Sequence, residues 1–317
     1  MSGPETRPLL VILSNEIQPA DAPGRYSAPY SVRSLMKAAD RAGFEVAAGP
    51  VWSFQLRLPS DGRPARLMAM GRVYEPAAMI VRATGGGSTH MVRAIDHALR
   101  RNGCVMLDPN ERFQRGSTDL SDLIVEAQGS GADVDRTLVA SRVDLAACLR
   151  AHDYSRGKLV AKSIAGSGGV SVRWVDGSAE SIRAVLDVAE SFGRQMPPFL
   201  IEPALDIAAE YRVYTLDGAV IGCVRRVAAG PERPANASQG AELVEEPAPA
   251  DVLDALGKVM RQGLIGWDVA RLADGRTVVI EMNRPPSWRH FAKVSKTDIA
   301  ELVVAHLKAR LAAAQAG

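Results

Sequence analysis

Asp268, Glu281 and Asn283 carry side-chain oxygens of the kind that bind hard cations such as Mg²⁺. They lie in the stretch GLIGWDVARLADGRTVVIEMNR, where two apolar segments flank an Asp-Gly dipeptide that is typical of tight β-hairpins. A two-residue loop at Asp274 and Gly275 would bring Asp268 directly opposite Glu281. Asn283 shares the face of Glu281 because strand side chains alternate. The pattern predicts that three oxygen donors converge at one end of a hairpin.

Two carboxylates that face each other across a sheet repel, so we expect a cation between them. Mg²⁺ shared with the phosphates of a substrate suits such a set of oxygen ligands. The alternative is a solvated sheet end with scattered acids, since the register depends on the assumed loop length.

A second predicted hairpin, AEYRVYTLDGAVIGCVRR, also turns at an Asp-Gly dipeptide. With a two-residue loop, its register places Glu210 opposite Arg225, and Arg212 projects from the same face. A glutamate with two arginines on one sheet face is either a surface lattice of ion pairs, which contributes little, or a site that handles anions. The neighbouring Arg226 and the polar segment PERPANASQGAE that follows favour the second interpretation.

A lysine stands just before a glycine-rich run in KLVAKSIAGSGGVSVRW, with Lys162 on the first predicted strand. Glycines let the backbone approach a ligand closely, so such a flap is one way to bind a triphosphate; a hairpin with a soft loop is the alternative. Further along, Glu202 ends the predicted strand in PPFLIEPAL. It is placed either to read the amino edge of an adenine or as an exposed acid.

The composition is ordinary for a soluble globular protein, with 47% hydrophobic and 23% charged residues in a chain of 317. A net charge of +2 gives no overall field that would attract nucleic acid or an anionic membrane. Three widely spaced cysteines form no metal-binding pattern and fit a reducing compartment. Without a signal peptide or membrane span, we expect a cytoplasmic protein.

The elements that position these residues fall into three predicted units. Strands alternate with helices up to residue 117, which argues for a small parallel α/β domain. There Arg82 leads into a glycine triplet before a helix, which is either an anion site or a flexible connection. Residues 118–197 contain the glycine-rich flap, and residues 198–317 contain both Asp-Gly hairpins and a final helix at 298–314.

The order of these signals resembles the ATP-grasp superfamily, most closely its RimK-type branch of glutamate and amino-acid ligases, which is similar to glutathione synthetase. The resemblance covers nearly the whole chain: AMIVRATGGGSTHMVRAI looks like the pre-ATP-grasp domain and EMNRPPSW like the terminal E-x-N-x-x-P element. It implies an α/β (α+β) fold, in which a parallel pre-ATP-grasp domain precedes two α+β subdomains.

The resemblance implies a role for each matching residue. Lys162 would contact the ATP phosphates, and Asp268, Glu281 and Asn283 would hold Mg²⁺, with two ions expected and Mn²⁺ as an alternative. The other implied nucleotide-binding residues are Gly166, Ser167, Gly168, Gly169 and Val170 in the flap, Glu202, Pro203, Ala204 and Leu205 around the adenine, and Glu210.

The same resemblance implies that Arg225 and Asn236 handle the oxygens of the transferred phosphoryl group and of an acyl phosphate, while Arg212 faces the substrate. The chain departs from the family where an Asp-Lys-Leu sequence is usual, because Leu120 stands in place of the lysine. That change removes a positive charge from the phosphate site and puts the strength of ATP binding in question. Gly240-Ala241 replaces the paired glycines after Asn236.

The implied reaction joins a carboxylate to an amine at the expense of ATP, through an acyl phosphate. The expected partners are a small-molecule or peptide carboxylate and the amine of glutamate or another amino acid, with no nucleic acid or membrane. Dimers and tetramers are frequent in the group. The alternatives are an ATP-grasp kinase that phosphorylates a hydroxyl and, because of Leu120, a nucleotide-binding regulatory protein without turnover.

Overall fold

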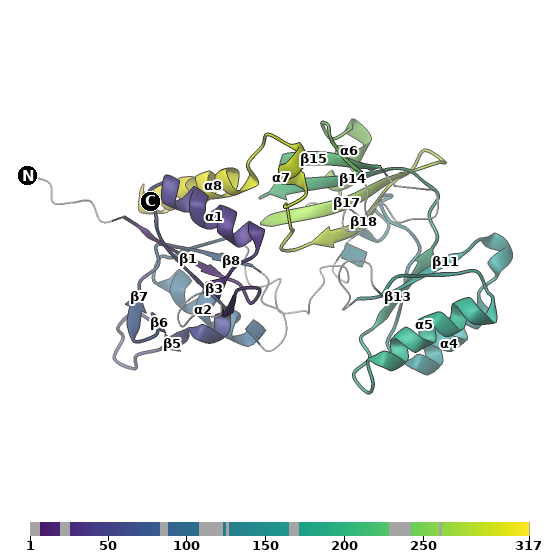
Figure 1. The fold of residues 1–317 in the computed structure, drawn as a ribbon, viewed down its shortest axis with the longest axis horizontal. Helices are drawn as coiled ribbons and strands as arrows, with labels where there is room; N and C mark the ends of the chain where they lie inside the picture. The colour runs from purple at the N-terminus through teal and green to yellow at the C-terminus, as the bar shows by residue number, and fades with distance from the viewer. Residues whose placement is uncertain are drawn as a thin grey trace, which may run out of the picture.

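The computed structural model describes residues 7–19, 26–82, 88–107, 123–124, 127–164, 171–227, 242–259 and 262–316. A parallel sheet near the N-terminus precedes antiparallel sheets, so the expected mixed α/β architecture is confirmed (Figure 1). Within the described residues, no helix is long and apolar enough to cross a membrane.

The N-terminal domain is built on a four-stranded parallel sheet in the order β4-β1-β8-β9. Its strands are β1 (Leu9–Leu13), β4 (Glu45–Gly49), β8 (Ala78–Val81) and β9 (Val105–Leu107). The first and third are apolar runs buried on both faces, as expected for parallel strands covered by helices. Two of the covering helices are α1 (Tyr30–Arg41) and α2 (Thr89–Arg101).

Short elements complete this domain. Where the sequence suggested one added hairpin, three antiparallel strands form a small sheet, β5 (Gln55–Arg57), β6 (Arg66–Ala69) and β7 (Arg72–Tyr74), after the 3-10 turn η1 (Val51–Ser53). The pair β2 (Gln18–Pro19) and β3 (Tyr26–Ser27) precedes α1.

The next unit is a four-stranded antiparallel sheet covered by two helices. The sheet has the order β10-β13-β11-β12, formed by β10 (Thr137–Val139), β11 (Leu159–Ser163), β12 (Arg173–Val175) and β13 (Phe199–Pro203). The helices α4 (Arg142–Ala151) and α5 (Ala179–Ser191) begin after Ser141 and Ser178, whose hydroxyls accept backbone N–H groups of the first turn. The 3-10 turn η4 (Tyr154–Arg156) leads into β11.

The third unit is a five-stranded antiparallel sheet that carries most of the predicted site. Its order is β16-β15-β14-β17-β18, formed by β14 (Ile207–Leu216), β15 (Ala219–Val227), β16 (Glu242–Glu245), β17 (Leu264–Leu272) and β18 (Thr277–Asn283). Helix α6 (Ala250–Gly257) packs against β17 and β18.

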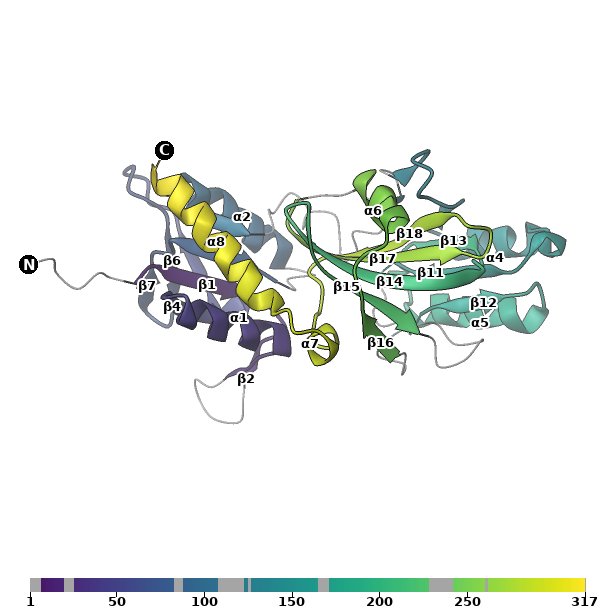
Figure 2. The same ribbon diagram turned by 90° about the horizontal axis from the view of Figure 1, so that it is seen from above.

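The last helix, α8 (Ile299–Ala316), returns to the N-terminal domain, where it lies beside α1 (Figure 2). Its residues Val303 and Leu307 belong to the same buried cluster as Leu35 of α1. The short α7 (Phe291–Val294) precedes it. The chain segment after β18 therefore connects the site-bearing sheet to the N-terminal domain. The predicted domain limits at 117 and 197 stay predictions.

Candidate active site

The first hairpin places its two acids as predicted, but by a different route. Asp268 lies opposite Glu281. The two-residue loop is wrong, because Arg271 pairs with Thr277, which lengthens the turn by one residue. A β-bulge then inserts Ile280 into β18, and this extra residue offsets the longer loop. The convergence of the acids therefore depends on the bulge.

The second hairpin shows the opposite outcome. Its loop is as predicted, with Leu216 opposite Ala219, but a bulge between Tyr214 and Thr215 shifts the rest of the register. Glu210 consequently faces Arg226, and the predicted pairing with Arg225 is wrong.

Arg225 itself points to the other face of the sheet. Its Nε lies 3.3 Å from Oε2 of Glu246, and 40% of its side chain is exposed. Because neighbouring residues on a strand alternate between faces, only one of the two adjacent arginines can join Glu210.

The charged cluster consists of Glu210, Arg212, Arg226, Asp268 and Glu281. Arg212 Nη1 and Arg226 Nη2 lie 2.6 Å and 2.9 Å from the same oxygen, Oδ1 of Asp268, and Arg226 Nη1 pairs with Glu210. The cation predicted between the acids is thus supplied by two guanidinium groups. They hold two of the three carboxylates in a largely buried site.

Burial and charge oppose each other in the charged cluster. Burial raises the pKa of Glu210 to about 7. Burial, followed by the negative charge of Asp268, also raises the pKa of Glu281. For Asp268 burial acts in the same upward direction, but Arg212 and Arg226 outweigh it and lower the pKa. Asp268 is therefore the carboxylate that is held ionised.

The donor set fits Mg²⁺ when a bound molecule supplies further ligands. Among the described residues, no three His, Cys, Asp or Glu side chains gather closely enough to hold a metal. The amide of Asn283 adds a third protein ligand, since its Nδ2 lies 3.4 Å from Oδ2 of Asp268 and rotation of the amide would present its oxygen there. Two carboxylates and an amide, completed by phosphate oxygens, are typical Mg²⁺ ligands.

A second set of buried charges adjoins the charged cluster. Lys162 Nζ lies 2.7 Å from Oε1 of Glu202, and Arg136 Nε lies 3.0 Å from Oε2 of the same residue. Glu202 is thus buried between two cations, so the alternative of an exposed strand-end acid is wrong. The positive charge of Lys162 also acts on Glu281, which places both sets in one electrostatic site.

Arg136 is the residue of this site that the sequence analysis missed. It precedes β10 in the small sheet, and its Nη2 donates to the carbonyl of Val279 on β18 at 2.9 Å. Arg136 therefore links the small sheet to the large one, close to the bulge at Ile280. An arginine before a short strand is common on protein surfaces, so no local signal separates it from a solvated residue.

The remaining predicted residues are only partly described. Pro203 and Ala204 follow Glu202 on the connection to β14, where Ala204 N–H donates to the carbonyl of Lys158 at 2.9 Å. Leu205 packs against the cluster of Ala270, Leu272 and Val278. The flap residues Gly166–Val170, Asn236 and Leu120 lie outside the described residues.

Comparisons with known proteins agree with this geometry. The model of an ATP-grasp domain family, the second family of its clade, matches residues 184–302. A search of curated proteins found no match. Among solved structures, the ATP-grasp ligase PsnB complexed with a minimal precursor is similar at 19% identity and a TM-score of 0.67, covering 96% of this chain and 99% of that chain.

Two further structures share the fold. The macrocyclase MdnC from Microcystis aeruginosa, bound with its precursor peptide MdnA, matches at 13% identity and a TM-score of 0.67, covering 94% of this chain and 99% of that chain. A RimK domain ATP-grasp protein from Sphaerobacter thermophilus matches at 15% identity and a TM-score of 0.62, covering 95% and 98%. The domain match and the fold shared along the chain place this protein in the ATP-grasp superfamily.

Proposed function

We propose that this protein is an ATP-dependent carboxylate–amine ligase. The carboxylate of one substrate attacks the γ-phosphorus of ATP, which gives an acyl phosphate and ADP. The amine of the second substrate attacks the acyl carbon, releasing phosphate and leaving an amide. We infer that glutamate or another amino acid is added to a small molecule, a cofactor or a peptide. The observation that carries this proposal is the convergence of Asp268, Glu281, Asn283 and Lys162 on an ATP-grasp fold.

The residues of the site divide between the nucleotide and the transferred group. Lys162 neutralises phosphate oxygens, as a lysine held by a buried carboxylate can. Asp268, Glu281 and Asn283 are the ligands of Mg²⁺, which when bound screens the charge of the phosphates. Glu202 anchors Lys162 next to the connection that leads to Leu205, where we place the adenine.

Two arginines support the acyl phosphate. Arg212 and Arg226 share one face of the sheet with the metal ligands, so their guanidinium groups are placed to stabilise negative charge on the transferred phosphoryl group. We therefore assign to Arg226 the role that the sequence suggested for Arg225. Arg225 is the weaker candidate because it pairs with Glu246 on the opposite face.

The relatives support ligation in general. PsnB is described as an ATP-grasp ligase, MdnC as a macrocyclase, and a further structural match, DcsG, as D-cycloserine synthetase. PsnB and MdnC were solved with precursor peptides, which supports a peptide among the substrates considered for this chain.

The test is a screen for ADP and phosphate release from MgATP with panels of carboxylates and amines, followed by mass spectrometry of the product. Asp268→Asn and Glu281→Gln should abolish turnover while circular dichroism shows a retained fold. The matched control is Asp274→Asn, because this exposed acid in the turn of the same hairpin contacts only Arg276 and the turn itself.

The outcomes separate the alternatives. Near-normal turnover in either site variant would contradict the metal assignment. A stable phosphate ester in place of an amide would identify a kinase. No ADP with any acceptor pair would favour a regulatory protein that binds nucleotide without turnover.

A further inference from the structure

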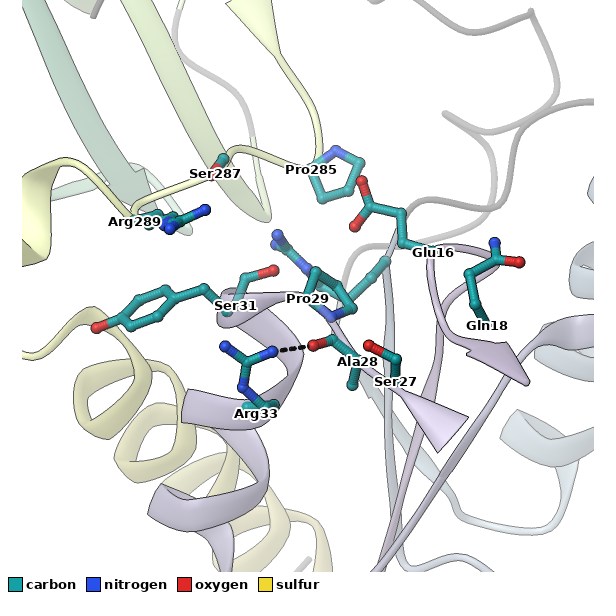
Figure 3. Close-up of a pocket in the computed structure, with 12 residues that line it drawn as sticks. Glu16, Gln18, Ser27, Ala28, Pro29, Ser31, Arg33, Pro285, Ser287 and Arg289 are labelled. Carbon is teal, nitrogen blue, oxygen red and sulfur yellow. Dashed lines mark hydrogen bonds between the residues drawn. The ribbon is translucent and has the colours of Figure 1, made fainter. Parts of the chain in front are cut away.

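A cavity of about 490 Å³ lies between the N-terminal domain and the segment that follows β18. Figure 3 shows Ser31 and Arg33 of α1 on one side of it, Ser287 and Arg289 on the other, and Glu16 at its edge. This volume is within the range of small-molecule binding sites.

The cavity is electropositive. Its lining contains three guanidinium groups, from Arg33, Arg82 and Arg289, and one carboxylate, from Glu16, which leaves a formal charge of +2. Arg33 and Arg289 are both exposed, and in the part of the chain that is described no ion pair joins either of them to a carboxylate. Their charges are therefore available to a ligand.

The start of α1 adds to this field. The residue before the helix is Pro29, which provides no side-chain cap, and the first turn contains no acidic residue. Ser31 of that turn lines the cavity. The unpaired backbone N–H groups at a helix N-terminus favour anions, so they act in the same direction as the arginines.

One wall of the cavity is rigid and adjoins the charged cluster. Arg82 is 2% exposed, its Nη2 donates to the carbonyl of Pro286 at 2.7 Å, and its guanidinium lies 4.6 Å from the ring centre of Trp288. A Cβ atom on Gly266 would lie 2.8 Å from Cβ of Pro286 and 3.0 Å from Nε of Arg212. The cavity wall and the proposed reaction centre therefore meet at Gly266.

We propose that this cavity binds an acidic amino acid, free or within a peptide, through its side-chain carboxylate, and that Arg33 and Arg289 select the acid over the corresponding amide. Glu16 on the same rim would pair with the ammonium group of a free amino acid. As a substrate site this assignment rests on the proposed ligase function; as a binding site it stands by itself.

The test is isothermal titration calorimetry on the full chain, without nucleotide and at low ionic strength. The probes are two matched pairs, L-glutamate with L-glutamine and the peptide Ala-Glu-Glu-Ala with Ala-Gln-Gln-Ala. We expect the acid of at least one pair to bind at least ~10-fold more tightly than its amide, as charge-assisted hydrogen bonds require. The pair that shows this preference identifies a free or a peptide-borne acid.

Variants assign the preference to the cavity. Arg33→Gln and Arg289→Gln should each reduce the preference for the acid, and the double variant should remove it. The control is Arg57→Gln, which removes an exposed arginine of β5 that does not line the cavity. Retained melting temperatures in all variants would show that the fold is unchanged.

Three results would overturn the proposal: no acid binds the wild-type chain at millimolar concentration, acid and amide bind equally, or the preference survives the double variant. Because no nucleotide is present, this outcome is independent of the ligase assay. Acid-selective binding without ADP release would reject the ligase function alone, and ligation without acid preference would reject the cavity assignment alone.

Discussion

Adjacent arginines on β15 provide a direct test of the observed register. Arg226 contacts two buried carboxylates, Glu210 and Asp268, and its side chain is 12% exposed. Replacing Arg226 with glutamine would leave both acids with Arg212 as the nearest remaining cation. Breaking a buried ion pair by removing one partner costs about 3–5 kcal/mol.

We expect the lower end of that range, about 3 kcal/mol, for Arg226→Gln. Arg212 remains on Asp268 at 2.6 Å, and Glu210, with its pKa near 7, can take up a proton near neutral pH. The matched variant Arg225→Gln removes a half-exposed pair with Glu246 and should cost no more than about 1 kcal/mol.

The assay is urea denaturation at pH 8, followed by both tryptophan fluorescence and circular dichroism to establish whether the transition is two-state. ADP release measured in parallel should fall strongly for Arg226→Gln and little for Arg225→Gln. The expectation fails if the variant at 225 is destabilised as much as the variant at 226. That result would mean that Glu210 faces residue 225, as the simple hairpin register predicted.

Three further perturbations test other parts of the site. Glu210 ionises at a higher pH in the folded state, with a pKa of about 7 against its usual 4.5, so its contribution to stability falls as pH rises through that window, and the melting temperature of Glu210→Gln relative to wild type should rise over the same interval; a constant difference would contradict this. Gly266→Ala should cost ~1–3 kcal/mol in urea denaturation and displace Arg212, whereas Gly257→Ala, in open space at the end of α6, should be neutral or stabilising; equal effects would count against the close packing at Gly266. Leu120→Lys should lower the apparent Michaelis constant for ATP, and an unchanged constant would mean that the phosphate site is already complete.

Short stretches of sequence were sufficient for much of the fold. Apolar runs, their period and the Asp-Gly turns are carried by a few neighbouring residues, so the parallel sheet and both hairpins could be predicted from local pattern. The likeness to ATP-grasp proteins rested on the order of such local motifs, and the comparisons confirmed it. The roles of individual site residues stay predictions.

The bulges could not be predicted in this way. Ile221, which the register of β15 skips, packs against the buried cluster shared with the N-terminal domain, and Ile280 packs beside Ala270 and Val278. Each bulge is thus associated with packing outside the turn that it modifies. One bulge preserved the facing of Asp268 and Glu281, and the other moved Arg226 into the place expected for Arg225.

Local spacing and side-chain chemistry specified the type and order of the elements and the residues able to bind metal and phosphate. Which of these charges meet depends instead on how the sheets pack in three dimensions. Arg136 reaches Val279 from 143 residues away, and Arg82 reaches Pro286 from 204 residues away. Such pairings arise from the packing of separate sheets, and no pattern within either segment encodes its distant partner.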